Sequence, residues 1–339
     1  APTTAPTTAP TQAPTLPPTQ MVLTAATDSA DGVTDGTVNL NYSLSGLAAL
    51  GIDTVSTAAN SGVGTVNIAG FGTNDFADIN SLSFSDALHV NLNLNSADDL
   101  LDGTTDGTVN LHTSLSGLAD IGIDTVSASA GSNTSTVNIA GFGTNDFADL
   151  NTLAFSDALH VNLQLNSADD LLDGTTDGTV NLHTSLSSLS EMGIDTVSSA
   201  AGSGVTDIII DGLGDIAQLQ HVTNFSAFGP GHAQISTNTA TLELHDISML
   251  IEAGLSFVAS ADITFADALA TGTMLADQGI DLSKLASLGI DHVDIGSAHF
   301  SIDSGIHATN NAPTDLASEL TTLISKFEAS APPIFQSTD

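Results

Sequence analysis

The stretch DGTTDGTVNLHTSLSGLADIGIDTVS at 102–127 determines the fold, because nearly the same sequence occurs three times in the chain. It returns as DGTTDGTVNLHTSLSSLSEMGIDTVS at 173–198 and is preceded by DGVTDGTVNLNYSLSGLAALGIDTVS at 31–56, with an offset of 71 residues in both directions. The intervening TVNIAGFGTNDFAD at 65–78 recurs at 136–149 with the same offset. A fixed period of this kind is typical of architectures in which successive copies stack on one another.

Weaker copies extend the array toward the C-terminus. DIIIDGLGD at 207–215 matches the start of the intervening segment, and TLELHDISMLIEAGLSFV at 241–258 and LASLGIDHVDI at 285–295 match the first quoted stretch. We therefore expect the repeat to persist, in diverged form, to about residue 300. The predicted organisation is a Pro/Thr-rich stalk or linker at 1–20, two and a half close repeats at 21–213, diverged repeats at 214–311, and a capping helix and tail at 312–339.

Within each repeat, polar and apolar residues alternate over short stretches. ALHVNLNLN at 87–95 places its leucines and valine on one face and His and Asn on the other, which predicts a half-buried strand. TVNLH at 108–112 and TVNIAG at 65–70 alternate in the same way. These three stretches are the predicted strands of the repeat.

Short helical patterns lie between these strands. SLSGLADIG at 114–122 has a serine cap at Ser114 and a terminating glycine. SADDLLDG at 96–103 has Ser96 as its predicted cap and two aspartates in its first turn, where the helix dipole favours them. NDFADINSL at 74–82 supplies a third pattern.

The order strand, helix, strand within about 35 residues favours parallel strands joined by crossovers. Since aromatic residues are only 4% of the chain, the core must be built by aliphatic stacking between units. We predict an α/β repeat array, an elongated solenoid-like stack with a 71-residue period. The alternative is a β-rich sandwich or solenoid with short helices.

The charge balance excludes several functions. The chain has 39 acidic residues and two basic ones, Lys284 and Lys326, for a net charge of −37. Such a surface repels nucleic acid and anionic lipid. No stretch is apolar enough over about 18 residues to cross a membrane, and cysteine is absent, so neither disulfides nor thiolate metal sites are available.

The acidic DGxTDG turns are the candidate ligand sites, because clustered carboxylates suit Ca²⁺. Asp-Gly is also ordinary turn chemistry, and the spacing matches no known calcium loop. Calcium is the ion that these turns suggest, and its candidate ligands are Asp98, Asp99, Asp102, Asp106, Asp169, Asp170, Asp173 and Asp177.

Histidine recurs with the repeat at His89, His112, His160 and His183. We expect these side chains on the polar strand face, where stacked copies would form a row able to bind Zn²⁺ or Cu²⁺. The competing interpretation is that they are solvated strand positions, since no unit contains a close His pair.

No catalytic motif is recognisable, and we predict that the chain is not an enzyme. A nucleophile elbow, a zinc-protease helix and a phosphate loop are all missing from the sequence. The repeated GFGTND at 70–75 is better explained by stacking than by a cofactor. Two carboxylates acting on a polysaccharide are the remaining enzymatic alternative, although the sequence nominates no pair.

The two ends differ from the repeats. APTTAPTTAPTQAPTLPPTQ at 1–20 is typical of an O-glycosylated stalk or linker, and a start inside such a tract suggests processing. Near the other end, Leu316, Leu320, Leu323 and Phe327 form the stripe of a predicted capping helix. The predicted sugar acceptors in the tract are Thr3, Thr4, Thr7 and Thr8.

Acidic, cysteine-free units rich in Gly, Asn, Asp and Thr, carried beside a Pro/Thr stalk, resemble bacterial extracellular repeat proteins of the adhesin, surface-layer and matrix type. This resemblance implies an extracellular or cell-surface location. The leading hypothesis is a subunit of a self-assembling filament, sheath or surface layer whose partners are copies of itself. The alternatives are an adhesin or carbohydrate-binding module with glycan partners, and a secreted polysaccharide-acting enzyme.

Overall fold

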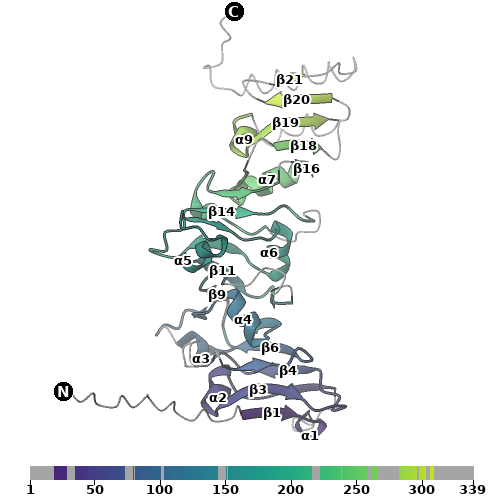
Figure 1. The fold of residues 1–339 in the computed structure, drawn as a ribbon, viewed down its shortest axis with the longest axis vertical. Helices are drawn as coiled ribbons and strands as arrows, with labels where there is room; N and C mark the ends of the chain where they lie inside the picture. The colour runs from purple at the N-terminus through teal and green to yellow at the C-terminus, as the bar shows by residue number, and fades with distance from the viewer. Residues whose placement is uncertain are drawn as a thin grey trace, which may run out of the picture.

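A computed structural model gives the fold of the chain (Figure 1). It describes residues 19–28, 35–72, 79, 81–100, 103–143, 150, 152–215, 222–237, 239–258, 261–265, 282–295, 298–302 and 306–308. The molecule is elongated, with strands stacked along its long axis from β1 at one end to β20 and β21 at the other (Figure 1). The predicted C-terminal helix and the glycosylation candidates of the Pro/Thr tract lie outside the described residues.

Two parallel sheets open the array. The first has the order β1-β3-β5, and the second has the order β10-β8-β6-β4-β2. The strands are β1 (Thr19–Leu23), β2 (Thr37–Asn39), β3 (Ile52–Thr57), β4 (Thr65–Ile68), β5 (Ser83–Phe84), β6 (His89–Leu94), β8 (Thr125–Ala128) and β10 (Ala154–Phe155).

Three further sheets continue the array with the orders β13-β11-β9-β7, β12-β14-β15-β17 and β16-β18-β19-β20-β21. Only the pairs that involve β20 are antiparallel among the described strand pairs. The strands are β7 (Thr108–Asn110), β9 (Thr136–Ile139), β11 (His160–Leu165), β12 (Thr179–Asn181), β13 (Thr196–Ser199), β14 (Asp207–Ile210), β15 (Ala233–Ile235), β16 (Thr239–Leu242), β17 (Leu255–Phe257), β18 (Ala261–Phe265), β19 (Ile290–Ile295), β20 (Ala298–Ile302) and β21 (Ile306–Ala308).

Short helices connect the strands. The described ones are α1 (Ala25–Asp28), α2 (Leu44–Ala49), α3 (Ser96–Asp99), α4 (Leu115–Ile121), α5 (Ser167–Asp170), α6 (Leu186–Met192), α7 (Leu244–Glu252) and α9 (Leu282–Ser287), with 3-10 turns η5 (Leu171–Asp173) and η7 (Ser226–Phe228). We call the stretch of chain from one strand to the next strand of the same sheet a coil. The predicted α/β repeat array is confirmed, and a sandwich is excluded because a sandwich pairs its strands antiparallel.

The strand register repeats with the sequence. Gln20 pairs with Thr54 between β1 and β3, and the equivalent pair between β6 and β8 is Asn91 with Thr125. The long strand β6 serves two neighbours, because its first residues pair with β4 and its last residues pair with β8. Each 71-residue repeat is thereby joined to the next by a shared strand.

Aliphatic side chains fill the interior. In β6, Val90, Leu92 and Leu94 are fully buried while the residues between them face outward, as the alternation predicted. Burying each such side chain contributes about 1.5–3 kcal/mol relative to leaving it exposed. The helices add Leu115 and Leu118 to the same core, so the strands and helices of successive coils share one apolar cluster.

The helix ends follow the sequence with one correction. Ser114 caps α4 as predicted, since its hydroxyl accepts a hydrogen bond from Gly117 N at 3.1 Å. Ser96 was wrongly predicted as the cap of the next helix pattern, because it is the first residue inside α3 and Asn95 is the cap. Asn95 Oδ1 accepts from Ala97 N at 2.8 Å. The helix predicted at 74–82 lies mostly outside the described residues.

Candidate functional site

The glycine loop at 70–72 links a helix of one coil to the carboxylate of another. Leu44 N, at the start of α2, donates to Gly70 O at 3.0 Å. On the other side of the loop, Gly72 N donates to Asp98 Oδ1 at 2.7 Å. The loop therefore satisfies helix N–H groups that have no partner within the helix. The next repeat has the same contacts, with Leu115 N donating to Gly141 O at 3.1 Å and Gly143 N to Asp169 Oδ1 at 2.7 Å.

Close packing explains why this loop is glycine-rich. Gly72 has a φ of 99°, which side chains rarely adopt, and an added Cβ would collide with Ser45 Oγ and lie 2.6 Å from Ser43 Oγ. Both serines belong to the start of α2, so only glycine allows the loop to lie against the helix. Gly143 and Gly214 meet the equivalent serines of their own repeats.

Two of the predicted calcium ligands, Asp98 and Asp169, are buried inside the array. Asp98 Oδ2 accepts from Asn95 N at 2.8 Å, which completes a capping box at the start of α3. Burial raises the pKa of Asp98 above its usual value, although backbone donors from Asn95, Gly72 and Phe71 act in the opposite direction. Asp169 has the same environment and a pKa raised for the same reason. These carboxylates join coils.

Asp99 and Asp170 are also buried, and each holds the turn that follows it. Gly107 N donates to Asp99 Oδ2 at 3.1 Å, and Gly178 N donates to Asp170 Oδ2 at 3.3 Å. Within the part of the chain that the structure describes, the other oxygen of each carboxylate is buried and has no hydrogen-bond partner.

The remaining described aspartates of these turns are exposed and hold their own loops. Asp106 Oδ1 accepts from Thr108 N, and Asp177 Oδ1 accepts from Thr179 N, both at 2.9 Å. Asp173 accepts from the N–H and hydroxyl of Thr175 at 2.8 and 2.6 Å, and these hydrogen bonds hold the pKa of Asp173 below its usual value. These are the contacts expected of Asp in tight turns.

The structure thus separates the candidate calcium ligands into buried and exposed sets. Asp102 lies outside the described residues. Across the described ranges, no group of three or more His, Cys, Asp or Glu side chains is arranged to hold a metal ion. Calcium binding stays a prediction from the carboxylate content of the turns.

Asparagine side chains form a ladder across the second sheet. Asn67 Nδ2 donates to Asn39 Oδ1 at 2.7 Å, and Asn91 Nδ2 donates to Asn67 Oδ1 at 2.8 Å. The hydroxyl of Thr125 ends the ladder on Asn91 Oδ1. Such amide ladders add side-chain hydrogen bonds in register with the backbone. The next repeat has the same ladder, formed by Asn110, Asn138, Asn162 and Thr196.

The aspartate of the GIDTVS segment caps a strand of the preceding coil. Val90 N, near the start of β6, donates to Asp124 Oδ2 at 2.7 Å. His89 Nδ1 lies 3.5 Å from the same carboxylate oxygen. The next repeat has the same arrangement at Val161, Asp195 and His160, with distances of 2.7 Å and 3.4 Å.

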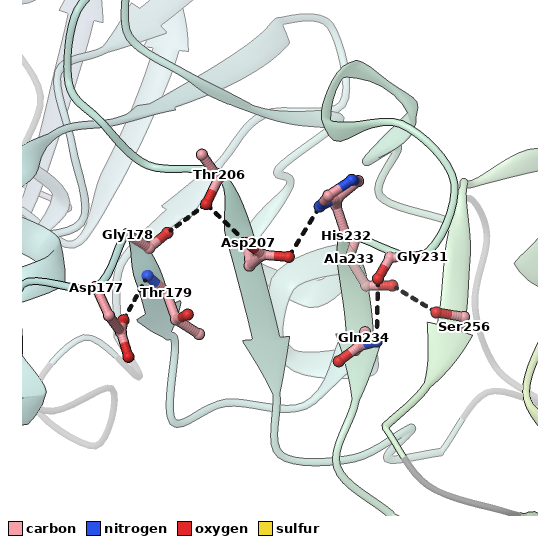
Figure 2. Close-up of polar contacts among 10 residues, drawn as sticks. All are labelled: Asp177, Gly178, Thr179, Thr206, Asp207, Gly231, His232, Ala233, Gln234 and Ser256. Carbon is pink, nitrogen blue, oxygen red and sulfur yellow. Dashed lines mark hydrogen bonds and ion pairs between the residues drawn. The ribbon is translucent and has the colours of Figure 1, made fainter.

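Another His–Asp pair joins β14 to the start of β15, as Figure 2 shows. His232 Nδ1 lies 2.9 Å from Asp207 Oδ1, and Thr206 Oγ1 lies 2.7 Å from the other carboxylate oxygen. The hydrogen bond from Thr206, and then the contact with His232, hold the pKa of Asp207 below its usual value. Further His–Asp pairs are His183 with Asp211 at 3.9 Å and His292 with Asp262 at 3.7 Å.

The expected row of histidines on the strand face is wrong for half of its members. His89 and His160 begin β6 and β11. His112 and His183 instead follow β7 and β12, each with a φ of 50°, at positions equivalent to Asn41. Leu111 N still donates to Asn138 O of the neighbouring strand, and the chain turns at His112, so the predicted strand at 108–112 ends two residues early.

Sequence reasoning missed the His–Asp pairs. The aspartate of GIDTVS recurs at Asp53, Asp124 and Asp195 without variation, which was the available signal. Its partners lie about 34 residues upstream, beyond any local pattern, and only the parallel register brings them together.

Comparisons with family models, curated proteins and solved structures found no match to this chain. Among the described residues, none of the helices has the length and apolar character needed to span a membrane.

Proposed function

We propose that this chain is an extracellular structural protein, a subunit of a self-assembling filament, sheath or surface layer. The observation that supports this proposal is that the repeated polar residues bind neighbouring coils to one another. The asparagines, the glycine loops and the recurring aspartates form contacts between coils, at equivalent positions in successive repeats. Polar groups repeated for a reaction would instead converge on one place where a substrate fits.

Composition supports an exposed location. With only two basic residues, the chain offers two cleavage sites to trypsin-like proteases. The net charge of −37 keeps separate molecules apart at low salt, and rising ionic strength screens that repulsion. A bacterial cell surface, copies of the same chain as partners, and glycans on the Pro/Thr tract belong to the same proposal.

Electron microscopy of the native protein tests the proposal. We expect negatively stained material to show filaments, sheaths or two-dimensional lattices at moderate salt. The same preparation with a calcium chelator, and with chelator plus excess Mg²⁺, separates a calcium requirement from a general ionic one. Dispersed monomers at every salt and calcium level would contradict the proposal.

A further inference from the structure

The first repeat exposes apolar side chains that the later repeats bury. Leu50 is 57% exposed, whereas Ile121 and Met192, at the same position one and two repeats later, are 2% and 3% exposed. Ile52 and Met21 are only partly buried. The equivalents of these two residues, Ile123, Ile194, Leu92 and Leu163, are buried. Tyr42 and Val22 are also exposed.

The later repeats show what normally covers this surface. The glycines that end α4 and α6 lie against the chain of the preceding coil: a Cβ on Gly122 would lie 3.2 Å from Phe84 O, and one on Gly193 would lie 2.9 Å from Phe155 O. The same relation recurs at Gly289, 2.8 Å from Phe257 O. For Gly51, the first of the series, no described atom lies within 4 Å of an added Cβ.

The edge of β1 shows the same difference between the first repeat and the later ones. In sequence, β1 is the equivalent of β6, and it pairs with β3 in the register that joins β6 to β8. The other edge of β6 pairs with β4, whereas the described strands include no neighbour on that edge of β1. An unpaired parallel edge beside exposed apolar residues favours addition of another strand.

We propose that this surface, to which Met21, Leu50 and Ile52 belong, is an interface that binds a second copy of the chain. The inference rests on the proposed function, since it assigns the contact through which copies assemble. In the later repeats, the end of a strand that carries phenylalanine covers the end of a helix. The proposed interface would repeat this contact between two copies of the chain. The tract at 1–18 suits this role poorly, because it has six prolines without N–H groups and Leu16 as its one large aliphatic residue.

The test compares Leu50→Glu with Leu171→Glu in the full chain. Leu171 is 56% exposed, so the control adds the same charge at an equally exposed leucine away from the interface. Sedimentation velocity is measured over a range of protein concentrations, from about 0.1 to 1 M NaCl, where the screening length falls from about 10 to about 3 Å. Thermal melts of all three proteins show that each is folded.

We expect the unmodified chain and Leu171→Glu to associate increasingly with concentration and salt. Leu50→Glu should weaken association by at least about tenfold with an unchanged melting temperature, because a central apolar contact dominates an interface. Equal association of Leu50→Glu and the unmodified chain, or monomers throughout, would overturn the inference. Filaments formed equally well by Leu50→Glu would leave the proposed function standing, whereas closed dimers lost in Leu50→Glu would support the interface and contradict the filament.

Discussion

At the scale of single residues, a substitution at Gly72 measures how closely the glycine loop at 70–72 packs against α2. Gly72→Ala places a Cβ against the serines at the start of α2, at a φ of 99°. We expect the free energy of unfolding to fall by about 3 kcal/mol or more, since positive-φ strain costs about 1–3 kcal/mol and the collision adds to it. Gly62→Ala is the matched control, because its φ is 75° and no described atom lies within 4 Å. Similar losses in urea unfolding of both variants would contradict the packing explanation.

The buried carboxyl of Asp98 predicts a pH dependence. Burial raises the pKa of this carboxyl in the folded chain above its ordinary value, so the stability that it contributes is fully present below about pH 4 and is lost as pH rises through the folded pKa. Asp98→Asn removes that titration and places an amide against a backbone donor, which costs about 1–3 kcal/mol.

Urea unfolding of Asp98→Asn and the unmodified chain between pH 4 and 7 measures this dependence. We expect the advantage of the unmodified chain in free energy of unfolding to be larger at pH 4 than at pH 7. Asp86→Asn, at an exposed carboxyl, serves as the control. Its difference from the unmodified chain in free energy of unfolding should change less between pH 4 and pH 7. An advantage that grows with pH would show that hydrogen bonds, and not burial, dominate at Asp98.

At the scale of elements, the asparagine ladder joins three strands of one sheet. Asn67 both donates to Asn39 and accepts from Asn91, so Asn67→Ala removes two hydrogen bonds. We expect a loss of about 1–3 kcal/mol, from about 0.5–1.5 kcal/mol per bond. Thr125→Val, at the other end of the ladder, removes the one ladder bond to Asn91 and should cost about half as much. Equal costs in chemical denaturation would show that the ladder does not act through these bonds.

At the scale of the whole molecule, the net charge of −37 opposes folding into a compact array. Raising NaCl from about 0.01 to 1 M shortens the screening length from about 30 to about 3 Å, so we expect the melting temperature to rise steadily. CaCl₂ at matched ionic strength separates screening from binding. A larger rise with Ca²⁺ than with Mg²⁺ would support the predicted calcium sites, and a melting temperature independent of salt would contradict the role of repulsion.

Local rules determined much of this architecture. The 71-residue period is visible in the sequence itself. Neighbouring residues determine the alternating strands and the serine and glycine helix ends, so these could also be predicted. The exposed turn aspartates also behave as their Asp-Gly context implies. The early turn at His112 and the cap at Asn95 differ from the predictions because one residue's backbone angle or side-chain hydrogen bond decides them.

Only the tertiary structure decided which residues meet. The parallel register brings Asp124 to His89 and lines up Asn39 with Asn67, although some 30 residues separate the partners in each pair. It also turns Asp98 inward as a link between coils instead of outward as a ligand. Leu50 and Ile121 occupy the same position of the repeat, yet only Ile121 is covered. The reason is physical: burial depends on whether a preceding coil lies beneath, and the sequence of one repeat carries no information about its neighbour.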